Sequence, residues 1–258
     1  MALRNNLKLM LEFSRLKSGF EQYFRVVPAL THELNEAAFR VRHSVYCEEL
    51  GWEPVRDNGF ETDEFDIHSR QCLLQNIHNG EFVGCIRIVI PHAELAEGRL
   101  PLQLTCGDNL NPNIPDPTLQ QRRAIGEISR LAVLGTYRRR PDERNKAVSI
   151  QEADYGSKQR PRFPYIPVGL YCGMLQMARR HGLERLYILT EPSLAQHFRH
   201  LGGRLVQVGE GIEHRGLRVP YEIPIDETIG KLSRFVRPLF DHIADEVDAA
   251  YRNPGRVA

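Results

Sequence analysis

The segment ETDEFD at residues 61–66 gathers carboxylates that could hold charge or move protons, chiefly Glu61, Asp63 and Asp66. Carboxylates a few ångströms apart repel one another and raise one another's pKa, so cations must lie among them. Three arginines stand in apolar surroundings where solvent cannot easily neutralise them: Arg42, Arg87 and Arg130. We expect these acids and bases to meet at one site. The alternative is a set of independent surface ion pairs, each contributing little.

A fourth carboxylate, Glu127, lies with Arg130 in the apolar run AIGEISRLAVL at 124–134. Residues three apart on a regular strand point to opposite faces. Glu127 and Arg130 could therefore line one cleft only through a β-bulge or at the end of the strand, and bulges do occur next to active sites.

The elements that position these residues follow from apolar spacing. Leu34, Ala38, Val41 and Val45 predict a helix over 33–50, and Gly51 suits its end. The β-rich runs at 70–77 and 81–91 are joined by HNG, which predicts a hairpin. The run at 124–134 is a third strand. Residues 52–70, and the Pro- and Asn-rich residues 101–118, are predicted to be loops.

The second half begins with a long basic loop at 135–164, and loops of this length are usually functional or mobile. After it the pattern predicts a helix at 166–181, a strand at 185–189, a helix at 192–201, strands at 204–209 and 217–225, and an amphipathic helix at 227–252. This order predicts an α/β (α+β) fold, a mixed sheet with helices packed on its faces. We divide the chain into an N-terminal helical extension (1–30), a main domain (31–226) and a C-terminal amphipathic helix (227–258).

The composition excludes several classes of protein. The 258 residues carry a formal net charge of +1, 41% hydrophobic and 26% charged residues, as in an ordinary globular protein, and give no support to nucleic-acid binding. Five scattered cysteines without a CxxC pair argue against a disulfide framework and a structural zinc site, and favour reduced cytoplasmic thiols. We expect no bound metal, because His197 and His200 lack a third ligand.

No segment resembles a signal peptide or reaches the roughly 18 apolar residues of a membrane span. Leu3, Leu7, Met10 and Leu11 do fall at helical spacing with basic neighbours. They predict either an ordinary docking helix or a membrane-surface or partner contact.

The motifs together resemble one family, the acyl-homoserine-lactone (autoinducer) synthases and N-acyl amino acid synthases, which are GNAT-like acyltransferases. VRHSVYCEELGW is similar to the family's first block through Arg42, Tyr46 and Trp52, and ETDEFD to its acidic triplet. Arg87 in VGCIRIVIP, and Glu127 and Arg130 in GEISRL, complete nine matches in order. The later segments RPRFPYIPVGLYCGMLQMARRHG and EPSLAQHFRHLGGRLVQVGEGIEHRGLRVPY resemble one branch, the PEP-CTERM/exosortase system-associated acyltransferases.

This resemblance implies a GNAT-like fold, with a mixed, mostly antiparallel sheet and helices on both faces. It implies transfer of an acyl group from a thioester to a small-molecule amine. Arg42, Tyr46 and Trp52 would border the amine pocket, and Asp63, Asp66, Arg87 and Arg130 would hold its charge network. A carboxylate must accept the amine proton, directly or through water, with Glu127 the first candidate and Glu61 the second. Arg130 completes this catalytic set.

The sequence departs from the family at two points. Tyr46 replaces the usual Phe, and LAVLGTYRRRPDERNK lacks the GxG of coenzyme A-dependent GNAT loops, which cradle pyrophosphate. No tightly bound cofactor is expected, and the co-substrate would be acyl-ACP or acyl-CoA. Acyl carrier protein, as a partner, would be attracted to Arg138, Arg139 and Arg140. The alternative is that these are solvated loop charges.

A long acyl chain needs an apolar lining, for which the helix at 166–181 offers Val168, Leu170, Tyr171 and Met174, although such residues are more often core. Three functions stay open. The first is an N-acyltransferase making an N-acyl amino acid or similar amide in a PEP-CTERM/exosortase context. The second is a homoserine-lactone synthase using S-adenosylmethionine. The third is a non-catalytic module that binds an acyl ligand.

Overall fold

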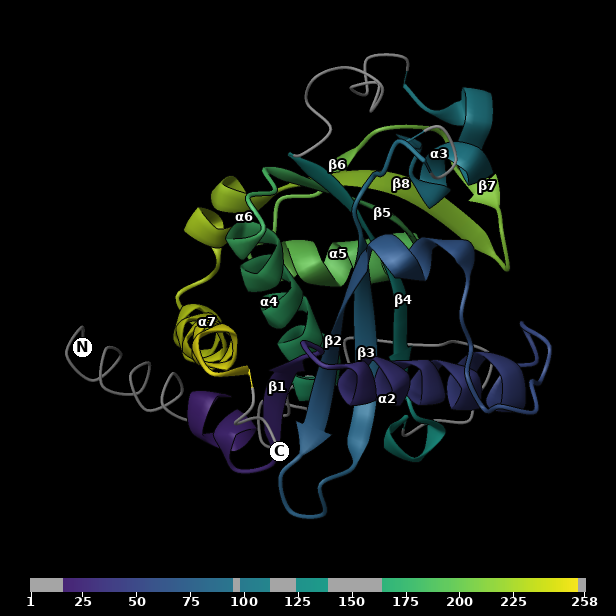
Figure 1. The fold of residues 1–258 in the computed structure, drawn as a ribbon. Helices are drawn as coiled ribbons and strands as arrows, with labels where there is room; N and C mark the ends of the chain where they lie inside the picture. Colours follow the sequence, from purple (N-terminus) through teal and green to yellow (C-terminus); the bar gives the residue numbers. More distant parts are fainter. Residues whose placement is uncertain (1–15, 95–97, 112–123, 139–163, 255–258) are drawn as a thin grey trace.

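The computed structural model describes residues 16–94, 98–111, 124–138 and 164–254. One twisted sheet runs through the molecule in the order β1-β2-β3-β4-β5-β8-β6, with β7 paired to β8 (Figure 1). Its strands are β1 Phe24–Pro28, β2 Ser69–Asn76, β3 Phe82–Val89, β4 Ile125–Val133, β5 Arg185–Thr190, β6 Val206–Gln207, β7 Ile212–Glu213 and β8 Leu217–Pro224. Among these described strands, β4 and β5 form the only parallel pair. The predicted mixed, mostly antiparallel sheet is confirmed.

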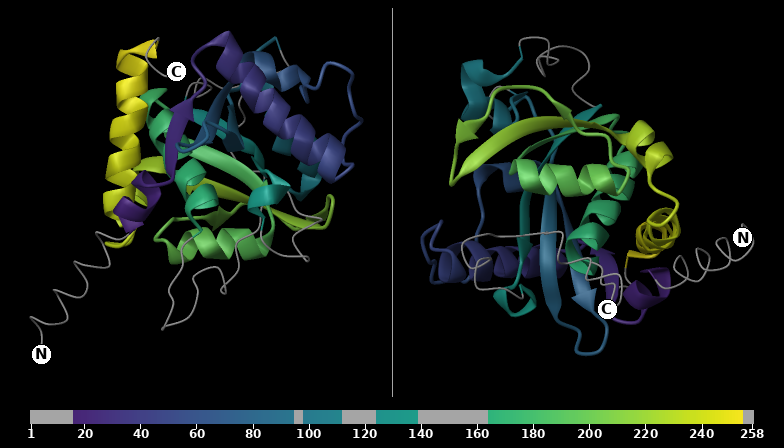
Figure 2. Two further views of the ribbon diagram at one scale, coloured as in Figure 1. Left: turned by 90° about the horizontal axis from the view of Figure 1, so that it is seen from below. Right: turned by 180° about the vertical axis from the view of Figure 1, so that it is seen from behind.

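Helices cover both faces of this sheet (Figure 2). They are α2 His32–Arg42, α3 Pro101–Cys106, α4 Tyr165–Arg180, α5 Pro192–His200, α6 Ile225–Lys231 and α7 Arg237–Arg252. Helix α2 packs on one face, against β2, β3 and β4, whereas α4 and α5 lie on the other. Helix α7 lies along β1 and α4, at the edge of the sheet.

Helix α4 is the centre of the main core. Every residue from Ile166 to Ala178 is buried, so the helix has no solvent face over thirteen positions. The helix is enclosed because the sheet, α6 and α7 all contact it. The helix ends at Arg180, and two residues later Gly182 has a positive φ of 70°, which is easily reached only by glycine.

Four local features differ from the sequence prediction. The predicted helix over 33–50 changes pitch: α2 ends at Arg42, and a π-helical segment, His43–Glu49, continues it. Strand β1 lies within the segment predicted to be a helical extension, and pairs with β2. Helix α3 occupies part of the predicted Pro- and Asn-rich loop, with Pro101 at its first turn, where a missing N–H costs nothing.

The fourth difference is at the C-terminal end. The predicted single helix over 227–252 is two helices, because Leu232–Val236 separates α6 from α7. The buried side chains of α7, among them Ile243 and Val247, belong to the same core as α4. Glu246 of α7 also accepts the outward-facing backbone N–H of Val26 at 3.1 Å, which covers part of the free edge of β1.

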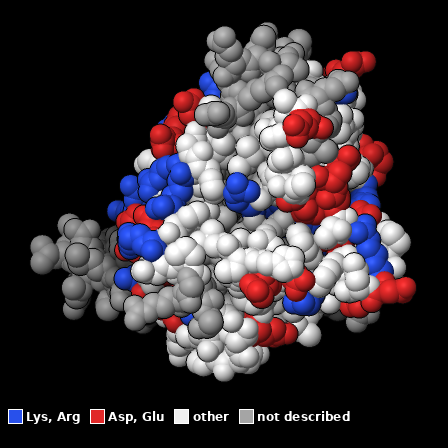
Figure 3. All heavy atoms as spheres, viewed as in Figure 1, with Lys and Arg blue, Asp and Glu red and all other residues white. Residues whose placement is uncertain are grey.

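Charged side chains are scattered in mixed clusters on the face shown in Figure 3, with a broad uncharged area between them. All five cysteines are buried and free of disulfides. Within the described ranges, no helix combines the length and the apolar character needed to cross a membrane.

Replacing Ile243 by Ala should lower the free energy of unfolding of the whole chain by about 2 to 5 kcal/mol, because it leaves a cavity where α7 meets the main core. Urea unfolding followed through Trp52, the single tryptophan, measures the change. The matched control is Asp241→Ala on the exposed side of α7, expected to change stability by about 1 kcal/mol or less. Equal effects of the two variants would contradict a docked α7.

Candidate active site

Three arginines and three carboxylates form a closed ring in which each charge contacts two of opposite sign. Nitrogen–oxygen distances around the ring lie between 2.5 and 3.1 Å. The members alternate in the order Arg42, Glu61, Arg130, Asp63, Arg87 and Asp66, and back to Arg42. The expected convergence of the acids with the arginines is therefore present.

Separate elements bring these six side chains together. Arg42 is the last residue of α2, Arg87 comes from β3 and Arg130 from β4. The carboxylates come from a short segment that is itself fixed by backbone hydrogen bonds. The Glu61 N–H donates to Phe39 of α2 at 3.2 Å.

The segment then turns into a 3₁₀ helix, Glu64–His68, whose first turn is closed by a capping box. Asp63 accepts from the Phe65 N–H at 3.0 Å, while Asp66 accepts from the Asp63 N–H at 2.8 Å. This reciprocal pairing holds the two aspartates through backbone contacts that are independent of the arginines.

The ring is ionised and largely excluded from water. Arg42 and Arg87 are at most 1% exposed, and so is Glu61. Burial alone would raise the pKa of Asp66, but hydrogen bonds and charge from Arg42, with Arg87, lower it to about 2. Burial likewise opposes ionisation of Glu61, and Arg42 and Arg130 overcome it and lower its pKa. A buried ionic group of this kind is tolerated because every charge is paired.

Of the two arrangements that would let Glu127 and Arg130 line one cleft, a β-bulge or the end of the strand, the structure has a β-bulge between β3 and β4. Cys85 is opposite Ala132 but Arg87 is opposite Ser129, so β4 has one extra residue in this interval. Arg130 lies in the bulge with a φ of 53°, an uncommon value for a residue with a side chain. The irregularity lets Arg130 and Glu127 line the same cavity.

Glu127 differs from the carboxylates of the ring. It is 4% exposed, and in the described residues no Lys or Arg lies within salt-bridge distance of it. Its Oε2 accepts the Leu102 N–H of α3 at 2.7 Å. Burial raises the pKa of Glu127 to about 8, although this hydrogen bond and the charges of Arg87 and Arg130 oppose the shift. Glu127 can therefore both hold and release a proton near neutral pH.

The cavity that contains Glu127 has a volume of about 360 Å³, within the range typical of ligand sites. It begins where β4 and β5 stop pairing, since their parallel ladder ends at Ile128 opposite Ile188 while both strands continue. Asp63, Arg87 and Arg130 expose one side of the ring to it. Its apolar lining comes mainly from Phe65, Leu102, Ile128, Leu131, Ile188 and Leu194.

Tyr46 and Trp52, which the resemblance implied would border an amine pocket, form an aromatic wall of this cavity. Their rings stack at 5.9 Å between centroids and 23° between planes. The Tyr46 hydroxyl donates to the carbonyl of Leu131 at 2.9 Å, and Arg130 lies over the Tyr46 ring at 5.8 Å. The wall is thus fixed to β4 and to the ring.

Sequence reasoning missed a further part of the cavity wall, where the β7–β8 hairpin contributes His214, Arg215 and Arg218. Arg215, with a φ of 55°, donates to the Trp52 carbonyl at 2.9 Å and contacts Glu53 at 2.8 Å. Burial, followed by the charges of Arg215, Arg218 and Arg130, lowers the pKa of His214. The only sequence signal was the basic turn HRG between two short strands.

Several predicted site residues lie elsewhere. Arg42, predicted to border the amine pocket, does not line the cavity: its side chain is fully buried and holds the ring together. Asp66 is likewise absent from the lining. Glu61 is also absent from it, and both of its oxygens contact arginines, so it is poorly placed to accept a proton.

The predicted acyl-chain residues Val168, Leu170, Tyr171 and Met174 are instead part of the main core, at most 2% exposed. They do not line the cavity that contains Glu127. Among the predicted donor-binding arginines, Arg138 pairs with Glu49. Arg139 and Arg140 lie outside the described residues.

The chain was compared with known proteins. A model of the acetyltransferase (GNAT) domain family matches residues 41–144. An acyl-homoserine-lactone synthase of Vibrio anguillarum is 31% identical over 72 residues, which is 28% of this chain and 36% of that protein. The match thus spans little more than a third of the relative's length.

Solved structures share the fold over most of the chain. TofI, in a ternary complex with an inhibitor and MTA, has a TM-score of 0.57 at 20% identity, covering 83% of this chain and 99% of that one. The AHL synthase LasI gives 0.55 at 18% identity, with coverages of 82% and 95%. FeeM, an N-acyl amino acid synthase from uncultured soil microbes, gives 0.50 at 15% identity, with coverages of 81% and 94%.

These likenesses and the sheet topology define the protein as having a GNAT-like acyltransferase fold. The matched GNAT domain and the acyl-homoserine-lactone synthase relative support the family resemblance that the sequence motifs carry.

Breaking the ring should be costly. Arg42→Met leaves Glu61 and Asp66 buried without their shared partner, so we expect it to lower the free energy of unfolding by about 3 to 5 kcal/mol. Arg40→Met on the same helix removes only an exposed pair with Glu36 and should cost about 1 kcal/mol or less. Urea titration of both variants measures the difference, and similar values would show that the ring contributes no more than surface pairs.

Glu127→Gln should make the protein more stable at alkaline pH. Because the pKa of Glu127 is raised, its contribution to stability is fully present below about pH 4.5 and is lost as the pH rises through about 8. The amide keeps an acceptor for the Leu102 N–H but carries no charge. Thermal melts at pH 5 and pH 9 should show the variant gaining on the order of 5 °C at the higher pH only. A gain independent of pH would contradict the shifted pKa.

Proposed function

We propose that the protein is an N-acyltransferase that moves a fatty acyl group from a thioester donor to the amine of an amino acid or related small molecule. The observation that carries the proposal is Glu127, a buried carboxylate without a cationic partner in salt-bridge distance among the described residues. It lies in a cavity that begins where β4 and β5 separate. Glu127 is buried and has a raised pKa, but it is not a member of the ionic ring. Its carboxyl group is therefore available for proton transfer.

The proposed reaction has a defined path for each proton and bond. An ammonium group has no lone pair, so Glu127, in its ionised form, accepts a proton from the acceptor amine directly or through water. The free amine attacks the thioester carbonyl carbon, the C–S bond breaks, and the thiolate leaves. The nitrogen, now bonded to the acyl carbon, releases its surplus proton to solvent, and the proton held by Glu127 passes to the thiolate, which restores the carboxylate. A pKa of about 8 suits both steps, because it lies close to that of amines and thiols.

The ring and the aromatic wall would position the acceptor. Asp63 presents a partly exposed carboxylate edge on one side of the cavity, and Tyr46 and Trp52 present flat apolar surfaces beside it. Because Arg42, Glu61 and Asp66 lie behind this edge, they act as positioning residues that keep Arg87 and Arg130 in place. In this proposal the acyl chain enters among Leu102, Ile128 and Leu194 rather than along α4.

The donor is acyl carrier protein or acyl-CoA. Arg138 pairs with Glu49, which neutralises part of its charge, so Arg138 by itself would attract an acidic carrier protein less strongly. The proposal includes an association with a PEP-CTERM/exosortase system, because the second half of the sequence resembles acyltransferases of that system. It also includes a cytoplasmic localisation, because the cysteines are free of disulfides.

The second candidate is an acyl-homoserine-lactone synthase using S-adenosylmethionine. The curated relative of that name favours it over the stretch of 72 residues that it shares with this chain. The third is a non-catalytic module that binds an acyl ligand in the same cavity.

Lipid extracts of cells overexpressing the chain, analysed by mass spectrometry, test the proposal. We expect a new N-acyl amino acid in wild type, reduced at least tenfold in Glu127→Gln, because the amide cannot accept the amine proton. Tyr46→Phe is the matched control: it keeps the ring surface, loses one hydrogen bond to Leu131 and should retain most of the product. In purified enzyme, activity should rise towards pH 8 as Glu127 ionises.

The other outcomes separate the candidates. An acyl-homoserine lactone whose formation needs S-adenosylmethionine would favour the second function. No new amide in wild type or in Glu127→Gln, with the chain folded and bound to an acyl ligand, would favour the third.

A further inference from the structure

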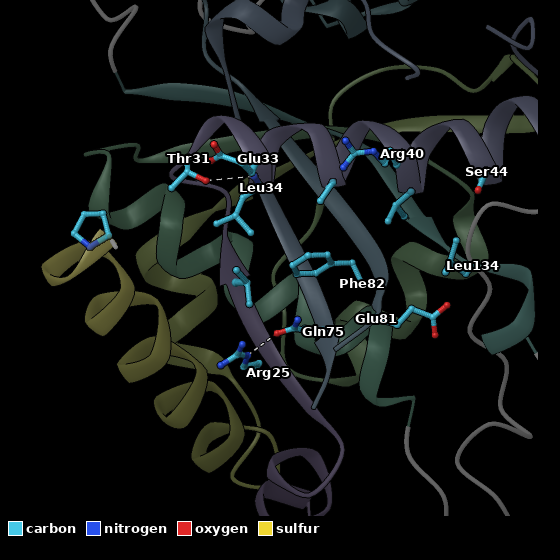
Figure 4. A pocket seen from close by; sticks show the side chains of 14 residues that line it. Arg25, Thr31, Glu33, Leu34, Arg40, Ser44, Gln75, Glu81, Phe82 and Leu134 are labelled. Carbon is cyan, nitrogen blue, oxygen red and sulfur yellow. Dashed lines mark hydrogen bonds between the residues drawn. The ribbon is translucent and has the colours of Figure 1, made fainter. Parts of the chain in front are cut away.

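A second cavity, of about 740 Å³, lies under α2, between that helix and the strands β1 to β3. It shares no lining residue with the candidate active site. Figure 4 shows Leu34 reaching from α2 towards the sheet, with the ring of Phe82 below it and Arg25 and Gln75 further along. Its volume is within the range of small-molecule sites.

The base of this groove is apolar. Leu34, Ala37 and Val41 lie at i, i+3 and i+7 on α2 and form one stripe about 10 Å long. Val27 and Phe82 face them from the sheet. The methyl group of Ala37 is the smallest side chain of the stripe, and the space it leaves open is where an apolar chain could lie.

Arg25 supplies a cation at the edge of this apolar surface. Its Nε donates to the neutral Gln75 side chain at 2.7 Å, a contact drawn in Figure 4. Within the described residues no carboxylate lies within salt-bridge distance of it. Glu246 is close enough for the charge of Arg25 to act on its pKa, but burial outweighs this effect and raises the pKa of Glu246 to about 7. The Oε2 of Glu246 already accepts the Val26 N–H.

The other charged groups of the rim are already engaged or lie at the surface. Arg40 pairs with Glu36 and lies over the ring of Phe60 at 5.0 Å. Glu81 accepts a hydrogen bond from the Tyr137 hydroxyl. Glu33 lies in the first turn of α2, where the backbone and Thr31 lower its pKa. Of the arginines on the rim, Arg25 is therefore the one whose charge is least neutralised by carboxylates, and it is the one available to an anionic ligand.

We propose that this groove binds a long-chain carboxylate, with its apolar chain between α2 and the sheet and its carboxylate on the guanidinium of Arg25. A hydrogen-bonded ion pair at the edge of an apolar groove fixes the orientation of such a ligand, while the chain supplies most of the affinity. The ligand chemistry is shared by free fatty acids and by N-acyl amino acids. The inference does not depend on the proposed acyltransferase activity.

Calorimetric titration of the full chain tests it, with dodecanoate and dodecyltrimethylammonium as probes of equal chain length and opposite charge. Wild type should bind dodecanoate more tightly. Arg25→Gln keeps a neutral side chain that can contact Gln75, and should weaken dodecanoate binding about tenfold without weakening dodecyltrimethylammonium. N-Dodecanoylglycine, titrated in parallel, shows which of the two carboxylate sources binds more tightly.

Two further variants locate the binding. Ala37→Trp fills the groove and should abolish binding of dodecanoate, with circular dichroism confirming that the chain is folded. Thr105→Trp, at an exposed position lining the candidate active site, should leave this binding unchanged. Equal dodecanoate affinity in wild type and Arg25→Gln would overturn the proposal. So would full retention of binding in a folded Ala37→Trp variant, or its loss in Thr105→Trp.

Discussion

The closed ring of three arginines and three carboxylates is the interaction on which the rest of this structure depends. Removing ions from water is expensive, and an isolated buried pair often fails to recover that free energy. Here each ion has two partners of opposite charge, so the Coulomb attraction is shared around a closed path and no member is left half neutralised. Because the ring joins α2, the acidic segment, β3 and β4, it holds those elements together at the candidate site.

The β-bulge in β4 follows from the same requirement. A regular strand would place Arg130 on the face opposite Glu127. The extra residue, and the positive φ of Arg130, turn its guanidinium towards Glu61 and Asp63 while Glu127 keeps its place under α3. Backbone strain of this kind persists only where the surroundings enforce it, and the ion pairs of Arg130 with Glu61 and Asp63 do so here. The bulge therefore links the stability of the ring to the geometry of the cavity.

The sequence was informative where charge interrupts apolar periodicity. Arg87 and Arg130 could not be buried in central strands without partners, and the acids at 61–66 could not remain together without cations, so their meeting was predictable. The aromatic positions Tyr46 and Trp52 were predicted from the family resemblance. The helices and most strands followed from spacing, with β1 missed because five residues next to a predicted helix gave too short a pattern.

Other parts of the site depend on contacts that no local pattern encodes. Arg215 contacts Trp52 and Glu53 across more than 160 residues of sequence, so its place in the cavity wall had no signal beyond a basic turn. Apolar spacing on α4 predicted burial correctly but could not distinguish a core lining from an acyl pocket, and the structure shows core. The segment Pro101–Cys106 appeared to be a loop, yet α3 supplies the N–H that contacts Glu127.

The balance of charges around the cavity explains why one carboxylate differs from the other three. Three arginines satisfy three acids completely, and each of those acids is held ionised, with the pKa of Asp66 lowered to about 2. Glu127 is a fourth acid beside a ring that has no fourth cation, and burial raises its pKa to about 8. If Glu127 were paired with an arginine, it would be as firmly ionised as Asp66 and too weak a base to take a proton from an amine. The ring therefore supports proton transfer by being complete without Glu127, which leaves the one titratable carboxylate of the group facing the cavity.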